Sequence, residues 1–219
     1  NRLDIMGTGT LNIDESRQLQ LITQYYKSQG DDNYGLNLGK GFSAISGSST
    51  PYVSKGLNSD RIPGTERHLI SLQYSDSDFL GQELVGQVYY RDESLRYYPF
   101  PTVNANKQAT AFSSSQQDTD QYGMKLTLNS QLMDGWQITW GLDAEHERFT
   151  SNQMFFDLAQ ASASGGLNNH KIYTTGRYPS YDITNLAAFL QSSYDINDIF
   201  TVSGGVRYQY TENRVDDFI

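Results

Sequence analysis

Residues 136–150 read WQITWGLDAEHERFT, and this stretch decides the fold. One face carries Trp136, Ile138, Trp140, Leu142 and Ala144, and the other carries Gln137, Thr139, Gly141, Asp143 and Glu145. Successive side chains of a β-strand point to opposite faces, so this strand has one apolar and one polar face. A tilted strand of about 9–11 residues is long enough to cross a membrane. The stretch therefore predicts a membrane-crossing strand.

The residues before this stretch complete a hairpin. Tyr122, Met124, Leu126 and Leu128 alternate with polar or small residues, and residues 132–135 supply a turn. The same alternation recurs along the chain and predicts an all-β, antiparallel, up-and-down sheet of about eight strands. We expect these strands at about residues 2–13, 17–29, 66–79, 83–98, 118–131, 136–150, 183–196 and 199–213.

Long and short connections alternate strictly between the predicted strands. Short turns fall at 14–16, 80–82, 132–135 and 197–198, and long loops fall at 30–65, 99–117 and 151–182, the last with a short helix within 154–163. All long loops therefore lie at one end of the sheet. Compact domains rarely contain structureless loops beyond about 15 residues. Outer-membrane barrels, in contrast, combine short periplasmic turns with long extracellular loops, so we predict a transmembrane β-barrel.

The composition argues against several classes of protein. The net charge of −9 argues against a nucleic-acid partner, because nucleic-acid-binding domains carry a basic patch. No apolar run approaches the 18 or so residues of a transmembrane helix. The chain has no cysteine, which excludes disulfides and thiolate metal sites. The 16 tyrosines suit a sheet with one polar face. They also suit an interface, because a tyrosine ring is apolar and its hydroxyl is polar.

Aromatic residues gather towards both ends of the predicted strands. Such rings form girdles at the two membrane interfaces of a barrel. We expect one girdle at Trp136, Tyr194 and Phe200 and the other at Tyr25, Tyr26, Tyr97, Tyr98 and Phe149.

Eight strands could close a small barrel, but the chain favours an arc of a wider one. Its polar faces carry the bulky charges of Arg91, Lys125, Glu145 and Arg207, which suit a wide lumen. We expect the lumenal cations Arg91, Lys125 and Arg207 to pair with carboxylates of neighbouring strands or of a plug inside the barrel. The chain begins in mid-strand and stops just past a strand, so we also expect it to be part of a longer protein.

Two segments resemble a known family. Residues 185–194 (NLAAFLQSSY), a short Asn-Asp turn and residues 204–208 (GGVRY) resemble the barrel hairpin of TonB-dependent outer-membrane receptors. The resemblance implies a 22-stranded barrel with an N-terminal plug, located in the outer membrane of a Gram-negative bacterium. It also implies TonB-dependent uptake of a ferric hydroxamate siderophore, ferric aerobactin or a related compound. We expect the plug, through which TonB would act, and the C-terminal strands to lie outside these 219 residues.

The sequence offers little support for catalysis. His68, His146 and His170 lie on different elements, and none has the spacing of a metal-ligand motif such as H-E-x-x-H. We therefore expect neither an enzyme nor a resident cofactor or metal. The iron would arrive already bound to the siderophore.

Ligand binding is the better-supported chemistry. An anionic ferric siderophore favours arginine, lysine and aromatic walls. Candidates at the loops and strand rims are Arg61, Arg67, Arg96, Tyr97, Tyr98, Phe100, Arg148, Lys171, Arg177 and Tyr178. The run 96–100 (RYYPF) leads, because it joins a rim strand to a proline-stiffened loop. We expect changing Arg96 and Tyr98 together to alanine to weaken binding at least about tenfold in the full receptor. For each residue the alternative is a solvated charge or a contact with lipopolysaccharide phosphate.

Two further interpretations stay open at this point. The chain could be a soluble β-sandwich that binds a ligand such as a carbohydrate, which requires two apolar faces to meet in one core. It could also belong to an enzymatic outer-membrane barrel such as a protease or phospholipase, but the sequence assembles no Ser/His/Asp or Asp/His set at the rim.

Overall fold

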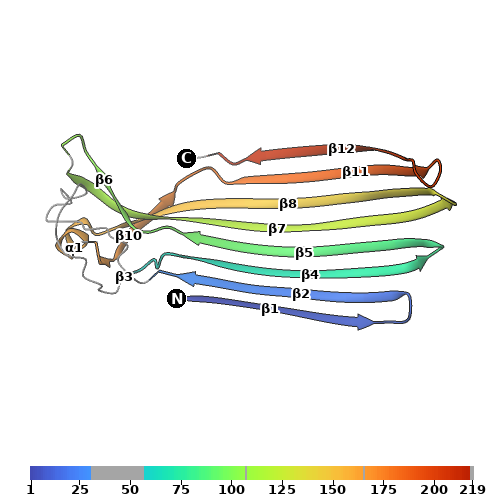
Figure 1. The fold of residues 1–219 in the computed structure, drawn as a ribbon. Helices are drawn as coiled ribbons and strands as arrows, with labels where there is room; N and C mark the ends of the chain where they lie inside the picture. The colour runs from blue at the N-terminus through green and yellow to red at the C-terminus, as the bar shows by residue number, and fades with distance from the viewer. Residues whose placement is uncertain (31–56, 107, 165, 218–219) are drawn as a thin grey trace.

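A computed structural model describes residues 1–30, 57–106, 108–164 and 166–217, and it confirms the all-β antiparallel fold. Eight long strands form one sheet in which each is hydrogen-bonded to the next along the chain (Figure 1). They are β1 (Arg2–Asn12), β2 (Arg17–Gln29), β4 (Gly64–Phe79), β5 (Gln82–Arg96), β7 (Ala109–Met133), β8 (Trp136–Phe156), β11 (Tyr181–Asp195) and β12 (Thr201–Val215). No helix in the described residues is long and apolar enough to span a membrane.

The short turns all lie at one end of the sheet and the longer connections at the other, as predicted (Figure 1). The β4–β5 turn shows how tight the short ones are. Leu80 and Gly81 both have positive φ angles, 54° and 77°. Two central residues of this kind are the mark of a type I′ hairpin, whose twist matches that of the flanking strands.

The sheet has one apolar and one polar face, as the alternation predicts. One row of register partners on the apolar face runs from β2 to β12 through Leu21, Leu72, Val88, Met124, Ala144, Leu186 and Tyr210. Every large member of this row is exposed. The polar face carries Gln87, Tyr89, Lys125, Asp143, Glu145 and Arg207 on the same strands.

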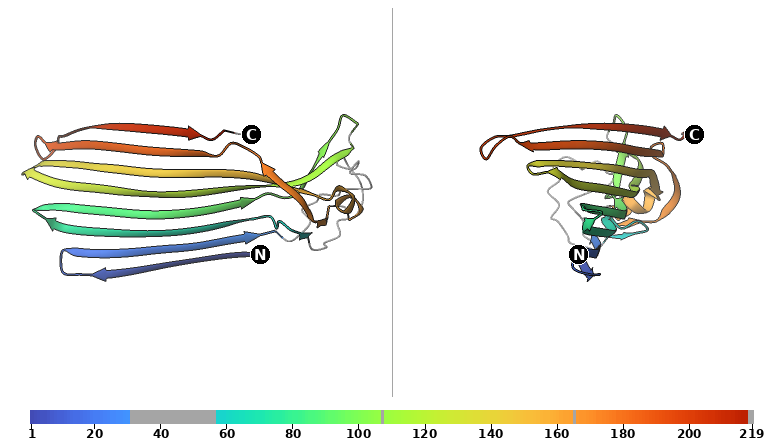
Figure 2. Two further views of the ribbon diagram at one scale, coloured as in Figure 1. Left: turned by 180° about the vertical axis from the view of Figure 1, so that it is seen from behind. Right: turned by 90° about the vertical axis from the view of Figure 1, so that its right-hand side faces the viewer.

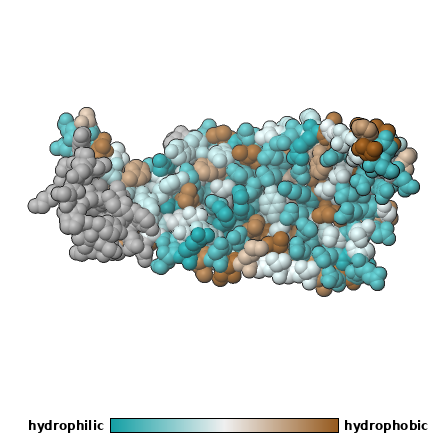
Figure 3. Space-filling view, viewed as in Figure 1, coloured by the Kyte–Doolittle hydropathy of each residue, from teal (hydrophilic) through white to brown (hydrophobic). Residues whose placement is uncertain are grey.

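The long strands make a single curved layer (Figure 2). The β-sandwich alternative is therefore not supported, since no second sheet covers the apolar face of the described strands. Apolar atoms also gather over the β11–β12 turn (Figure 3), where Ile196, Ile199 and Phe200 are exposed.

The structure places the residues of the two expected girdles differently at the two ends of the sheet. Trp136 and Tyr194 meet edge to face at the short-turn end, with ring centres 6.3 Å apart. At the other end the strand alternation separates the expected residues. Tyr25 lies on the apolar face, while Tyr26 and Phe149 lie on the polar face, because each is one position out of phase with the apolar residues of its strand.

Two strands continue well past their predicted ends. β7 begins at Ala109 instead of about residue 118, and β8 continues to Phe156 instead of about residue 150. Both additions fall in segments predicted to be loops, and we call residues 109–117 and 151–156 the β7–β8 extension. The loops also contain β3 (Asn58–Ser59), β6 (Phe100–Val103), β9 (Asn168–Asn169) and β10 (Lys171–Gly176). The predicted helix is shorter, with α1 spanning Leu158–Ala163.

The best-packed part of the molecule is this extension. Phe112 on β7 and Phe156 on β8 are fully buried, with ring centres 6.1 Å apart, and Ala161 of α1 packs on them. Ser113, Ser114 and Ser115 are also fully buried. Small side chains let other segments cover both faces of the extension, so it forms a platform for the loop end.

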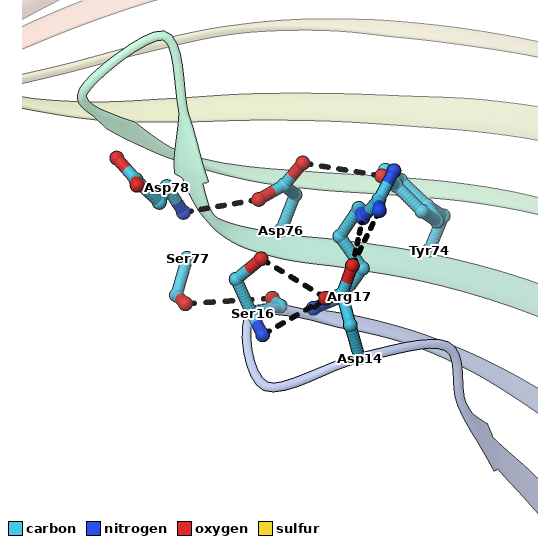
Figure 4. A network of polar contacts seen from close by, with 7 residues as sticks. All are labelled: Asp14, Ser16, Arg17, Tyr74, Asp76, Ser77 and Asp78. Atoms are coloured by element: carbon cyan, nitrogen blue, oxygen red, sulfur yellow. Dashed lines mark hydrogen bonds and ion pairs between the residues drawn. The ribbon is translucent and has the colours of Figure 1, made fainter.

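A polar network fixes the β1–β2 turn at the short-turn end of the sheet (Figure 4). The carboxylate of Asp14 accepts hydrogen bonds from the backbone amides of Ser16 and Arg17 and pairs with the Arg17 guanidinium. The guanidinium, as the main cause, holds the pKa of Asp14 well below its usual range. Ser77 at the end of β4 joins the same turn through the carbonyl of Ser16.

Candidate ligand-binding site

Three of the predicted ligand-binding residues meet at the loop end of the sheet. The guanidinium carbon of Arg177 lies 5.2 Å from the centre of the Tyr178 ring and 5.9 Å from the centre of the Phe100 ring. We call Phe100, Arg177 and Tyr178 the Arg177 cluster. A guanidinium over aromatic faces gains cation–π stabilisation and keeps planar N–H donors that suit a carboxylate or hydroxamate ligand. The cluster thus combines the cation and the aromatic walls that an anionic chelate requires.

The β7–β8 extension holds the backbone of this cluster from both sides. Phe100 opens β6 and is the register partner of Ser113 on β7. Arg177 follows β10, and its amide donates to the carbonyl of Ser151 on β8 at 3.1 Å. The cluster therefore forms because two loops that are distant in sequence pair with adjacent strands.

Arg61 lies in the same region but is buried, with 6% of its surface exposed. Its guanidinium donates to the carbonyl of Ser114 at 2.8 Å and to the side-chain oxygen of Asn152 at 2.5 Å. Burial lowers the pKa of Arg61. The residue predicted to bind ligand thus points into the protein, where it contacts both strands of the extension.

The first and third loops are fastened together beside Arg61. β3 and β9 form a short parallel pair, Asn58 with Asn168 and Ser59 with Asn169. The Asp60 carboxylate accepts the backbone amide of Lys171 at 2.7 Å, and this bond holds the pKa of Asp60 below its usual value. Asp60 also lies 3.6 Å from His170. Sequence reasoning missed this contact because its partners are 111 positions apart.

The remaining candidates are scattered. Arg67 pairs with Glu93 at 2.8 Å on the polar face, and Arg96 approaches Glu66 at 3.3 Å on the apolar face. Tyr97 is exposed and donates to Gln117. The leading run 96–100 is thus divided, with Arg96 on the apolar face and Phe100 in the Arg177 cluster.

Tyr98, Lys171 and Arg148 complete the predicted set. Tyr98 is half-buried beside buried Pro99, and Lys171 is an exposed residue at the start of β10. Arg148 is exposed and shares the apolar face of β8 with Trp140 and Leu142. Strand alternation thus places Arg148 on the outer side of the rim instead of at the mouth of a lumen.

One of the expected lumenal cations, Arg207, pairs with a carboxylate of the same sheet. Arg207 of β12 reaches across β11 to Asp143 of β8 at 2.8 Å. The hydroxyl of Tyr89 donates to Glu145 at 2.6 Å across Gly123, which lies between them in the register. In the residues that the structure describes, no group of three or more His, Asp or Glu side chains could hold a metal ion.

A curved antiparallel sheet with an exposed apolar face, a polar inner face and all long loops at one end is an arc of a transmembrane β-barrel. The profile of the family described as TonB dependent receptor-like, beta-barrel matches residues 7–219, and the chain belongs to this family. As part of such a barrel it lies in the outer membrane of a Gram-negative bacterium.

Individual relatives agree with this assignment. The chain is 91% identical to a ferric aerobactin receptor of Klebsiella pneumoniae and 90% identical to one of Escherichia coli, over all 219 residues in both cases. It spans 30% of the length of each of these relatives. A solved structure described as the copper transporter OprC has the same fold, with a TM-score of 0.66 and 12% identity, covering 98% of this chain and 28% of that one.

Proposed function

We propose that this chain is part of a receptor that takes up ferric aerobactin across the outer membrane with energy from the TonB system. The observation that carries the proposal is the 90–91% identity to two ferric aerobactin receptors along the whole chain. The fold supports it, because the apolar face suits lipid and the polar face a lumen. The protein acts as a receptor and transporter, not as an enzyme, and holds no cofactor of its own, the iron being cargo.

The Arg177 cluster is the site that we assign to the ligand. Ferric aerobactin carries carboxylates, and a guanidinium that retains free donor directions can bind them with two parallel hydrogen bonds. Phe100 and Tyr178 give the apolar walls that most ligand sites use. The cluster lies at the loop end of the sheet, which is the extracellular end in a barrel with short periplasmic turns.

The remaining partners follow from the same orientation. The apolar face meets the hydrocarbon of the outer membrane. Lys27 and Arg96 both approach Glu66 on that face near the loop end of β4, where they suit lipopolysaccharide phosphates. TonB acts through a plug domain supplied by the rest of the protein.

A segment exchange tests the proposal. The 219 residues replace the matching segment of the Escherichia coli relative, and the chimera is produced in a strain without its own aerobactin receptor. We expect uptake of radiolabelled ferric aerobactin at a rate within about twofold of the unaltered receptor, and loss of uptake when TonB is absent. A chimera that reaches the surface but gives no more uptake than the receptor-free strain contradicts the proposal.

A further inference from the structure

We propose that Arg61 is a positioning residue that holds the Arg177 cluster in its ligand-binding geometry. This inference rests on the proposed function and adds a role for a residue that cannot itself reach a ligand. Its basis is a chain of hydrogen bonds and strand pairings from Arg61 to both sides of the cluster, through adjacent residues of the β7–β8 extension.

The first step is the burial of Arg61. A buried guanidinium loses its hydration and is costly unless its donors are satisfied. In the described part of the chain no carboxylate lies within ion-pair distance of Arg61, and its partners are the Ser114 carbonyl and the Asn152 side chain. Arg61 is therefore not a solvated charge on a surface loop. Its two donors instead tie the first loop to two neighbouring strands at once.

The second step leads from Ser114 to Phe100. The hydroxyl of Ser114 donates to the carbonyl of Tyr97 at 2.7 Å, and the amide of Tyr97 donates to the carbonyl of Ser115 at 2.9 Å. Three residues further on, Phe100 pairs with Ser113. The Arg61 guanidinium thus fixes β7 at the point where the chain turns from β5 into β6.

The third step leads from Asn152 to Arg177. Asn152 is the register partner of Gly176, the residue before Arg177, and the next carbonyl along β8, that of Ser151, accepts the Arg177 amide. Arg61 therefore contacts a residue adjacent to the anchor of Phe100 and a residue adjacent to the anchor of Arg177. Removing its guanidinium loosens the spacing between the two ring contacts of Arg177.

The experiment uses the full-length receptor in detergent and measures the Kd for ferric aerobactin. We expect Arg177→Ala to weaken binding about tenfold and Arg61→Gln to weaken it about fivefold. Because Arg61 acts through the cluster, Arg61→Gln in the Arg177→Ala background should have less than a twofold further effect, a non-additivity typical of coupled residues. Arg61→Lys keeps the charge and one donating nitrogen but not the planar fork, so its affinity should lie between that of Arg61→Gln and that of the unaltered receptor. Arg17→Gln, at the opposite end of the sheet, is the control and should leave Kd unchanged.

A readout without siderophore separates this inference from the proposed function. Arg177 is half-buried, and we expect Arg61→Gln to raise the rate of tryptic cleavage after Arg177 at least threefold in the folded receptor. If Arg61→Gln does not reach the surface, Asn152→Ala, which removes one of the two acceptors, takes its place.

Equal loss of affinity in both backgrounds, or no change in Kd while Arg177→Ala weakens binding, overturns the inference and leaves the proposed function standing. If Arg177→Ala leaves Kd unchanged, the result counts against the assigned site itself. If Arg61→Gln then also leaves cleavage after Arg177 unchanged, the positioning role is overturned as well.

Discussion

Arg177 lies over the rings of Phe100 and Tyr178, and this placement distinguishes it from the other candidate cations. Arg67 and Arg96 each approach a carboxylate, and Arg61 is buried against a carbonyl and an amide. The structure records two ring contacts for Arg177 and no ion pair among the described residues. A guanidinium without a fixed counter-charge is better able to donate hydrogen bonds to an anionic ligand.

This difference predicts a ranking of variants. In the full receptor, Arg177→Ala should weaken ferric aerobactin binding about tenfold, equivalent to about 1.4 kcal/mol. The affinity of Arg177→Lys should lie between those of the unaltered receptor and Arg177→Ala, because lysine keeps the charge but loses the planar fork. Arg96→Ala should change the affinity less than Arg177→Ala, since its guanidinium is directed to Glu66 on the apolar face. Fluorescence quenching titrations measure all three, and a larger loss for Arg96→Ala than for Arg177→Ala would reverse the ranking.

The sequence could predict Arg177 as a candidate but not its neighbours. A loop arginine beside a tyrosine suits an anionic ligand, and that reasoning also selected Arg61, Arg96 and Arg148. The burial of Arg61 was out of reach, because charged residues are almost never fully buried unless paired, and its partners lie 53 and 91 positions away. Local patterns cannot report contacts that depend on the packing of three loops.

Elements followed the sequence closely wherever one face is apolar and the other polar. The pairing of β7 with β8 between residues 118 and 150 agrees with the alternation in that stretch. The prediction fails outside this stretch, although the pairing continues. There Ser113, Ser114 and Ser115 are buried and carry no alternation of apolar and polar residues. Strand extension there depends on cover from β6, β10 and α1, which is a tertiary effect.

Two glycines in the sheet carry a prediction about strand packing. A Cβ on Gly141 would lie 2.4 Å from the Leu126 carbonyl oxygen and 2.5 Å from the Phe189 ring, and one on Gly123 would lie 2.8 Å from the Tyr89 ring and 2.9 Å from the Ala144 carbonyl oxygen. Each alanine substitution should therefore lower the free energy of unfolding by about 1–3 kcal/mol, as overpacking does, with Gly141 the more affected.

Gly86 is the matched control in a central strand. The nearest atom to its added Cβ is the Leu126 side chain at 3.7 Å, which is ordinary contact. Gly86→Ala should be neutral or stabilise by up to about 1 kcal/mol, since alanine loses less backbone entropy. Urea unfolding of the full receptor in micelles compares the three variants, and an equal loss for all of them would show that close approach is not the cause.

The contact between the first and third loops should depend on pH through Asp60. Its pKa is lowered in the folded protein, so its contribution is fully present above the ordinary aspartate pKa of about 4 and is lost as the pH falls through the lowered value. The chain has no cysteine, so Asn58→Cys on β3 accepts a single spin label within it. In the full receptor, labelled at this position alone, we expect the label to become more mobile below about pH 4 and to be mobile at every pH with Asp60→Ala. A label that stays immobile in the Asp60→Ala receptor at neutral pH would contradict this role of Asp60.

The molecule as a whole is an open arc with two kinds of uncovered boundary, the apolar face of the sheet and its two edge strands. The accessible surface is 13845 Å², about a third more than the roughly 10,000 Å² expected for a folded soluble monomer of this mass. Much of the exposed surface is apolar, for example Val88, Met124 and Leu186. β1 and β12 each have only one neighbour among the described strands, and unpaired edges of this length promote aggregation.

These boundaries predict how the 219-residue chain behaves alone. In detergent-free buffer we expect it to remain aggregated or unfolded and to show no cooperative thermal transition as a monomer, because neither lipid nor further strands cover its apolar face and edges. Size-exclusion chromatography with circular dichroism measures this, with the full receptor refolded into micelles as the control. A monomeric chain that melts cooperatively in plain buffer would require the apolar face to be buried within the chain. The single-layer sheet offers no second layer to bury it, so such a result would contradict the barrel-arc assignment itself.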